Sequence, residues 1–402
     1  MNTILFLIFL LKLYITIMAK IFKMGLTKGK SYSMLLTDRQ TDRQIRYEWL
    51  DTIRVVAAVL VIVSHFAYYF PFERLHLIND YLAGSTGRIG VCLFFAISGY
   101  LVSHSLEKNS SLLRFYWFKF VHIVLPFISS YFALSGLFIG LAFLRPDFLQ
   151  QTPISHVLFI GGDYKAFLLG VFPIDVHLGQ FLQMPSYWFV GEWFIGTVVS
   201  LYIISPFLFC LAKKIPVLSM AGMIILSVII YEQMDNWWNH GFWFFLVRMP
   251  EFYIGILLHM YRQELASNKE RWMWVTFLLV TIVVMADMVI YAHPMIADRF
   301  IPLKPRSFLF SFPMIIFVFL GSEWVNRQLD LQWVNEYSKK TYTFMLIQHV
   351  VINTFMWNFD EQNFSKLGVL VSFVFIFVTT VYLAGKITGF YKPIENFLLH
   401  KE

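Results

Sequence analysis

Long apolar stretches separated by short polar segments repeat along this chain of 402 residues. Ten of them are candidate membrane spans, measured against the ~20 apolar residues that a helix needs to cross a bilayer. They cover residues 50–70, 88–106, 119–144, 187–211, 217–231, 241–261, 272–292, 307–321, 341–357 and 367–390, the fifth and eighth being short for a full crossing. Because the stretches show no strict alternation of apolar and polar positions, we expect helices rather than barrel strands. The pattern predicts an all-α fold, a polytopic membrane bundle of about ten transmembrane helices.

The first part of the chain departs from this pattern. Its apolar run from Ile4 to Met18 is short for a span and is interrupted by Lys12, and the sequence Thr-Asp-Arg-Gln then occurs twice in succession, at 37–40 and 41–44. We interpret this part as an appendage that arises from a start codon assigned too early, with an additional cytoplasmic or interfacial anchor as the alternative. The chain then divides into three segments: an N-terminal appendage (1–46), the transmembrane domain (47–391) and a short cytoplasmic tail (392–402).

The composition agrees with a membrane protein and bears on its partners. Hydrophobic residues make up 58% of the chain and charged residues only 14%, against about 25% charged residues in soluble domains. The net charge of +7 comes from basic residues in short segments between apolar runs, which argues against a nucleic-acid partner. Lys and Arg number 21 in the segments on the side of the two termini and eight on the other side, which predicts that both termini are cytoplasmic. Without the appendage the comparison is 14 to eight.

The two cysteines, Cys92 and Cys210, both lie inside apolar runs. Two such residues provide neither a disulfide framework nor a metal-binding cysteine pair. We therefore expect no bound metal.

The apolar stretch at 50–70 carries ionisable residues that it does not need in order to span a membrane. Arg54 and His65 are eleven residues apart, which on a helix places them on one face and roughly 16 Å apart along the axis. Asp51 precedes Arg54 by one turn and joins the same face. Each ionisable group at membrane depth costs roughly 2.5–3.5 kcal/mol on insertion scales. Either these residues are an interfacial arginine and a structurally paired histidine, or they are a general base and a cation for an anionic ligand.

The next apolar stretch contains a second motif, in which Phe94 and Phe95 are followed by Ser98 and Gly99. Small residues inside a span allow another helix or a ligand to approach the backbone closely. Alone, such a pair is more often a packing motif than a site. We expect Ser98 and Gly99 to lie against the helix that carries Arg54 and His65, or against the acyl chain of a ligand.

In their order and spacing these two motifs resemble the acyltransferase-3 family of integral-membrane O-acyltransferases. That family pairs an arginine with a histidine after ten intervening residues in its first helix, and has a Phe-Phe-x-x-Ser-Gly signature in its second. Three later segments are similar to family motifs and extend the resemblance over about 47–391: Trp193 with Tyr202 and Pro206, Arg248 to Gly255, and Tyr342 to His349. The chain departs from many members at Lys119, where they have a run of arginines, and at Val198, where they have a glutamate.

The resemblance implies transfer of an acyl group, usually acetyl, from cytoplasmic acyl-CoA to a hydroxyl of a cell-envelope or secreted glycan. It implies that His65 is the catalytic base and that Arg54, with Asp51 and Lys119, binds the donor. Residues expected to line or support the site are Phe94, Phe95, Ser98, Gly99, Trp193, Tyr202, Arg248 and His349. Acyl-CoA, acetyl-CoA above all, is then a co-substrate rather than a bound cofactor, and the protein resides in the bacterial cytoplasmic (inner) membrane.

Two other functional classes are compatible with a polytopic bundle. A transporter or flippase for a glycan also builds its path from buried arginine and histidine, but we find no inverted repeat of hydropathy or motif between the two halves of the chain. A membrane sensor without catalysis leaves Arg54 and His65 unexplained. The acyltransferase is therefore the favoured interpretation.

Overall fold

The described part of the chain is helical. The computed structural model describes residues 41–69, 86–108, 111–144, 170–174, 177–178, 190–237, 244–292, 306–328, 332–356 and 364–399. Its main helices are α2 (Thr41–Ala67), α4 (Thr86–Lys108), α5 (Leu112–Lys119), α6 (Leu125–Leu144), α10 (Glu192–Lys214), α11 (Pro216–Trp237), α12 (Phe245–Met260), α13 (Arg262–Ser267), α14 (Lys269–Ala292), α16 (Arg306–Gln328), α17 (Gln332–Met356) and α18 (Lys366–Leu398). The all-α prediction is therefore confirmed.

Each of the ten predicted apolar stretches overlaps at least one of these helices. Within the described residues, five helices are long and apolar enough to cross a membrane: Trp49–Ala67, Thr86–Lys108, Leu112–Gly140, Trp193–Lys214 and Lys366–Leu398. The apolar parts of α11 and α16 are shorter, at Pro216–Tyr231 and Ser311–Ser322. The count of about ten spans is thus not confirmed. Most of the predicted appendage lies outside the described residues, but α2 already begins at Thr41, so the second Thr-Asp-Arg-Gln copy is continuous with the first apolar helix.

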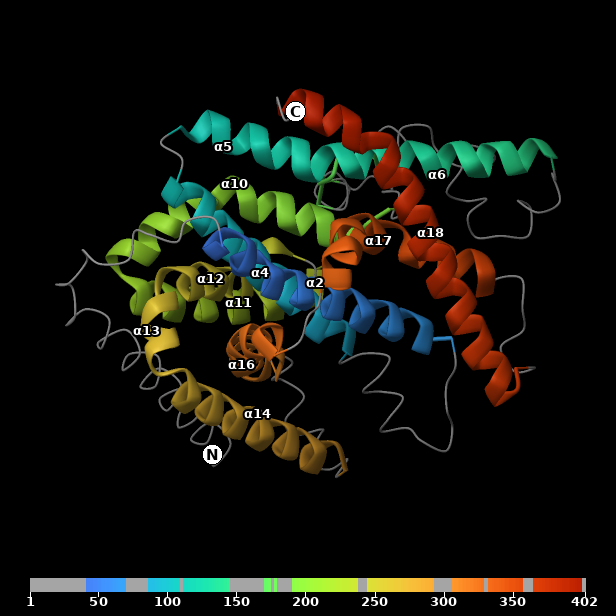
Figure 1. The fold of residues 1–402 in the computed structure, drawn as a ribbon. Coiled ribbons are helices and arrows are strands. Elements are labelled where there is room, and N and C mark those ends of the chain that lie inside the picture. Colours follow the sequence, from blue (N-terminus) through green and yellow to red (C-terminus); the bar gives the residue numbers. More distant parts are fainter. Residues whose placement is uncertain are drawn as a thin grey trace.

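The helices pack around a centre formed by α2, α4, α12 and α17. Figure 1 shows α5 and α6 as one long rod along one side of the bundle and α14 along the opposite side, with these four helices between them. The closest helix pairs are α4 with α12, α2 with α4, α2 with α17 and α17 with α18. α2 is therefore enclosed by neighbours, and its polar residues meet protein groups from α4 and α17.

Two glycines bring α4 and α12 into backbone contact. A Cβ atom built at Gly99 would overlap the carbonyl oxygen of Phe252, and one built at Gly255 would overlap the carbonyl oxygen of Ala96. The first alternative for Gly99, contact with the helix of Arg54 and His65, is wrong, because the atoms nearest to Gly99 belong to α12; contact with an acyl chain stays a prediction. The glycines of α4 that face α2 are Gly87, next to Ser64, and Gly90, where a Cβ would lie 2.6 Å from the carbonyl oxygen of Ala57.

A short π-helical turn, Phe120–Val124, interrupts the rod between α5 and α6. Pro126, two residues after this turn, has no N–H to donate to the carbonyl of His122, four residues earlier, so the regular hydrogen-bond ladder fails here. The Tyr342 hydroxyl of α17 donates to the Ile123 carbonyl over 2.9 Å. This turn thereby ties the rod to α17 directly after Lys119.

Candidate active site

Two hydrogen bonds align α2 and α17 side by side in the same direction. Ser338 Oγ donates to Asp51 Oδ1 over 2.6 Å, and the side-chain nitrogen of Gln348 lies 2.6 Å from His65 Nδ1. Both contacts connect the polar face of α2 to α17. The helix pair therefore carries two polar clusters, one at each end of the Arg54–His65 interval.

The first cluster, which we call the Arg54 cluster, comprises Asp51, Arg54, Ser98, Lys119 and Tyr202. Arg54 forms an ion pair with Asp51, and the two side chains are 27% and 18% exposed. Arg54 also interacts electrostatically with Lys119 and Tyr202, and Ser98 is hydrogen-bonded to Tyr202. The Lys119 ammonium lies 5.0 Å from the centre of the Tyr202 ring, a cation–π contact.

The Arg54 cluster combines two cations with one carboxylate, so its formal charge is positive. It draws its members from α2, α4, α5 and α10. Two cations and a phenol at the end of an apolar bundle suit an anionic ligand with phosphate or carboxylate groups. All three residues expected to bind the donor, Arg54, Asp51 and Lys119, are brought together here.

The second cluster, which we call the His65 cluster, comprises His65, Tyr69, Gln348, His349 and Asn353. The rings of His65 and His349 are 5.1 Å apart. Asn353 Nδ2 donates to His349 Nε2 over 3.1 Å, and the Tyr69 hydroxyl donates to Asn353 Oδ1 over 2.6 Å. These contacts link His65, in the last turn of α2, through His349 and Asn353 to Tyr69, which lies just after the helix. Helix geometry places this cluster roughly 16 Å from the Arg54 cluster along α2.

A fully buried ion pair supports the bundle beside these clusters. Arg248 and Glu251 of α12 are both 0% exposed, and their nearest N–O distance is 2.8 Å. Cys92 donates to Glu251 Oε1 over 3.5 Å, and the Arg248 guanidinium lies 5.7 Å from the ring centres of both Phe95 and Trp193. Three of the residues expected to line the site, Phe95, Trp193 and Arg248, therefore pack together around this ion pair.

The two other residues of the second motif have different environments. Phe94 contacts Phe194 of α10, with ring centres 5.8 Å apart. Gly99 belongs to the crossing of α4 with α12 and contributes no side chain to either cluster. Of the Ser98–Gly99 pair, only Ser98 therefore joins the candidate site.

Several residues that complete the site were not among the predicted site residues, although Tyr342, Gln348 and Glu251 lie within quoted motifs. They are Ser338, Tyr342, Gln348 and Asn353 from α17, Tyr69 just after α2, and Glu251 from α12. A signal was present for three of them, because amides and a hydroxyl inside the apolar stretch at 341–357 need polar partners. The pairing of Asp51 with Ser338 had no such signal, since Ser338 lies in a polar segment ahead of that stretch.

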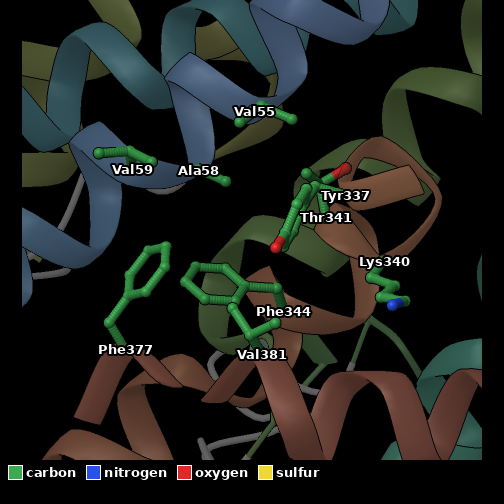
Figure 2. A pocket seen from close by; sticks show the side chains of 9 residues that line it. All are labelled: Val55, Ala58, Val59, Tyr337, Lys340, Thr341, Phe344, Phe377 and Val381. Atoms are coloured by element: carbon green, nitrogen blue, oxygen red, sulfur yellow. The ribbon is translucent and has the colours of Figure 1, made fainter. Parts of the chain in front are cut away.

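An apolar groove lies along α2 next to the Arg54 cluster. Figure 2 shows its walls, formed by Val55, Ala58 and Val59 of α2, Tyr337, Lys340, Thr341 and Phe344 of α17, and Phe377 and Val381 of α18. Its empty space is about 340 Å³, part of it open to the outside, and one of the nine lining residues is charged. Such a lining suits an alkyl chain and provides no general base.

Outside the five long apolar helices, one buried histidine is notable. His177 packs against the rings of Phe244 and Phe245 and against Gly196, and it is 6% exposed. Burial lowers its pKa to about 4. His177 is therefore neutral at neutral pH and has a structural role.

Comparisons with known proteins show the family to which this chain is similar. A family model described as an acyltransferase domain matches residues 47–387. An O-acetyl transferase of Shigella phage Sf6 is 40% identical to this chain over 73 residues, which are 16% of this chain and 19% of that protein. The aligned part is thus about a fifth of the relative. No solved structure matches.

Proposed function

The chain belongs to the acyltransferase-3 family of membrane acyltransferases, and we propose that it moves an acyl group, acetyl above all, from cytoplasmic acyl-CoA to a sugar hydroxyl of an envelope or secreted glycan. The phage relative, an O-acetyl transferase, supports oxygen as the accepting atom and acetyl as the group. The observation that carries the proposal is the pairing of a cationic cluster and a histidine cluster on one helix pair, α2 and α17.

In this proposal the Arg54 cluster binds the phosphates of the donor. A guanidinium offers a planar fork that grips phosphate in two places, and Lys119 adds a point charge. Asp51, held by Ser338, fixes the position of Arg54 through their ion pair. The extended pantetheine arm then runs along α2 and delivers the thioester to the His65 cluster.

His65 takes the proton of the acceptor hydroxyl as the hydroxyl oxygen attacks the thioester carbonyl. The new C–O bond forms, the C–S bond breaks, and the proton leaves with the thiolate as the CoA thiol. Each transfer thus yields one ester and one free thiol. His349, whose ring lies 5.1 Å from that of His65, is placed to support the proton transfer.

A genetic experiment tests this function. Cells that lack the gene are compared with cells that carry the intact gene or the His65→Ala variant, and base-labile O-acyl esters on their surface glycans are measured. We expect loss of the esters in the deletion strain, recovery with the intact protein, and no recovery with His65→Ala although that variant accumulates in the membrane.

Two results would contradict the proposal. Esters that persist in the deletion strain would remove the acyltransferase assignment for the tested glycan. Absence of the whole glycan from the surface, rather than of its esters, would indicate the transporter alternative.

A further inference from the structure

The contact between His65 and Gln348 restricts which ring nitrogen of His65 is able to act as a base. The Gln348 side-chain nitrogen lies 2.6 Å from His65 Nδ1. An amide NH₂ group only donates hydrogen bonds, so in this arrangement Nδ1 accepts, and a neutral His65 carries its proton on Nε2. A ring in that tautomer has its lone pair covered by the amide and presents an N–H to an incoming hydroxyl. It does not act as a base in that state.

The oxygen of the same amide indicates which orientation of Gln348 allows His65 to act as a base. Gln348 is 1% exposed, and its Oε1 is buried without a hydrogen-bond partner among the described residues. A buried unsatisfied carbonyl costs about 1–3 kcal/mol. Rotation of the amide by a half turn about its last side-chain bond exchanges oxygen and nitrogen. It places Oε1 against Nδ1, gives that oxygen a donor, and puts the lone pair of the neutral ring on Nε2.

We propose that Gln348 is a positioning residue for His65: its Oε1 accepts a hydrogen bond from Nδ1–H and thereby makes Nε2 the catalytic base. This inference rests on the proposed acyl transfer. The acceptor hydroxyl gives its proton to Nε2 while its oxygen bonds to the thioester carbon. The resulting imidazolium keeps Nδ1–H on Gln348 Oε1, and the Nε2 proton then passes to the sulfur of the departing thiolate. Gln348 gains and loses no proton.

The surroundings of His65 make the amide the suitable partner. From α17 the titratable group in contact with His65 is His349, whose own Nε2 is occupied by Asn353. Just after α2, Tyr69 bonds to Asn353. From α4, Gly87 lies against Ser64 of this part of α2, next to the exposed Arg88. Across the α18 contact, Phe373 packs against Phe66. None of these contacts places a carboxylate beside His65 to hold its Nδ1 proton.

Two substitutions separate positioning from packing. Gln348→Glu keeps the length and an acceptor oxygen but has no NH₂ donor, whereas Gln348→Met keeps the volume and has no acceptor. In purified protein with labelled acetyl-CoA and the glycan acceptor, we expect Gln348→Met to lower kcat by at least about tenfold, with the KM for acetyl-CoA unchanged, because a misaligned proton-transfer group loses part of its 10²–10⁴-fold contribution. Gln348→Glu is expected to remain within about threefold of the unmodified protein.

The pH profile supplies a readout that a purely structural role does not move. A carboxylate beside Nδ1 favours the protonated ring, so the acid limb of the kcat profile is expected to shift to higher pH in Gln348→Glu. Thr354→Val, on the same helix, is the matched control, since the Thr354 hydroxyl bonds to the Val350 carbonyl of its own helix. Thr354→Val is expected to keep both the kcat and the pH profile of the unmodified protein.

The outcomes distinguish this inference from the proposed function. Equal kcat and equal profiles in Gln348→Met, Gln348→Glu and the unmodified protein would overturn the positioning role. An equal loss of kcat in both variants would also overturn it, since the acceptor oxygen kept in Gln348→Glu would then not preserve activity. If Gln348→Met does not fold, the presence or absence of the profile shift in Gln348→Glu decides alone. Full activity of His65→Ala would instead refute His65 as the base, whatever Gln348 does.

Discussion

A single methyl group at Gly99 is expected to push α4 and α12 apart. An ideal Cβ there overlaps the Phe252 carbonyl oxygen, and it lies 2.9 Å from the carbonyl carbon of the same residue and 3.2 Å from the Ile256 nitrogen. All three are backbone atoms, which cannot move aside by a change of rotamer. Overpacking typically costs about 1–3 kcal/mol, while alanine gains about 0.5–1 kcal/mol over glycine inside a helix. We therefore expect Gly99→Ala to lose about 1–2 kcal/mol of folding free energy on these two scales.

Thermal unfolding of the detergent-purified protein, followed by tryptophan fluorescence, measures this loss. The controls are Gly136→Ala in α6 and Gly222→Ala in α11, where an added Cβ meets no atom within 4 Å. The unfolding entropy grows with chain length, so 1 kcal/mol shifts the midpoint of this chain of 402 residues by about 1–2 °C. A fall of about 1–3 °C is therefore expected for Gly99→Ala and no fall for the controls. Gly255→Ala should behave like Gly99→Ala, because its Cβ overlaps the Ala96 carbonyl. Equal midpoints for Gly99→Ala and Gly136→Ala would refute the close crossing.

Three further predictions concern charge. Arg54→Lys keeps the positive charge but loses the planar guanidinium, so acyl-CoA binding measured by calorimetry should weaken. The loss of affinity should be larger in Arg54→Ala. Unchanged affinity in both variants would show that Arg54 has a structural role only. Arg248→Met leaves Glu251 buried without its ion-pair partner and should lower the free energy of unfolding by about 3–5 kcal/mol. Arg248→Met combined with Glu251→Leu should recover most of the thermal midpoint. Equal midpoints for the single and double variants would contradict this. Burial lowers the pKa of His177 from 6.5 to about 4 in the folded protein. As the pH falls, the unfolded chain therefore binds a proton at His177 before the folded chain does, and the free energy of unfolding should fall by about 2 kcal/mol between pH 7 and pH 5. His177→Phe should show a smaller fall in the midpoint over that range, and an identical fall would exclude His177 as the source.

The sequence predicted those features that depend on one helix at a time. The eleven-residue interval between Arg54 and His65 fixes their common face because α2 is unbroken between them. Asp51, one turn before Arg54, pairs with it as the spacing suggested. Apolar length alone located the helices, because a backbone in a bilayer satisfies its polar groups within a helix.

Contacts between distant helices were beyond the sequence pattern. Small size predicts that Gly99 permits a close approach, but it does not say that the neighbour is α12, nor that Gly87 and Gly90 are the glycines of α4 that meet α2. Gln348 lies 283 residues from His65 in the chain, and only the side-by-side packing of α2 and α17 brings them together. The convergence of Lys119 with Arg54 similarly depends on how the α5–α6 rod crosses the bundle, to which the π-helical turn after Lys119 contributes.

The most direct test of the account is the chemical step itself. Purified protein in detergent or nanodiscs is given labelled acetyl-CoA and the glycan acceptor, and ester formation is followed for the unmodified chain and for His65→Ala, with thermal midpoints measured in parallel. We expect a loss of about 10²–10⁴-fold in kcat for His65→Ala at an unchanged midpoint. A loss of only about twofold in a fully folded variant would contradict the assignment of His65 as the base that drives acyl transfer.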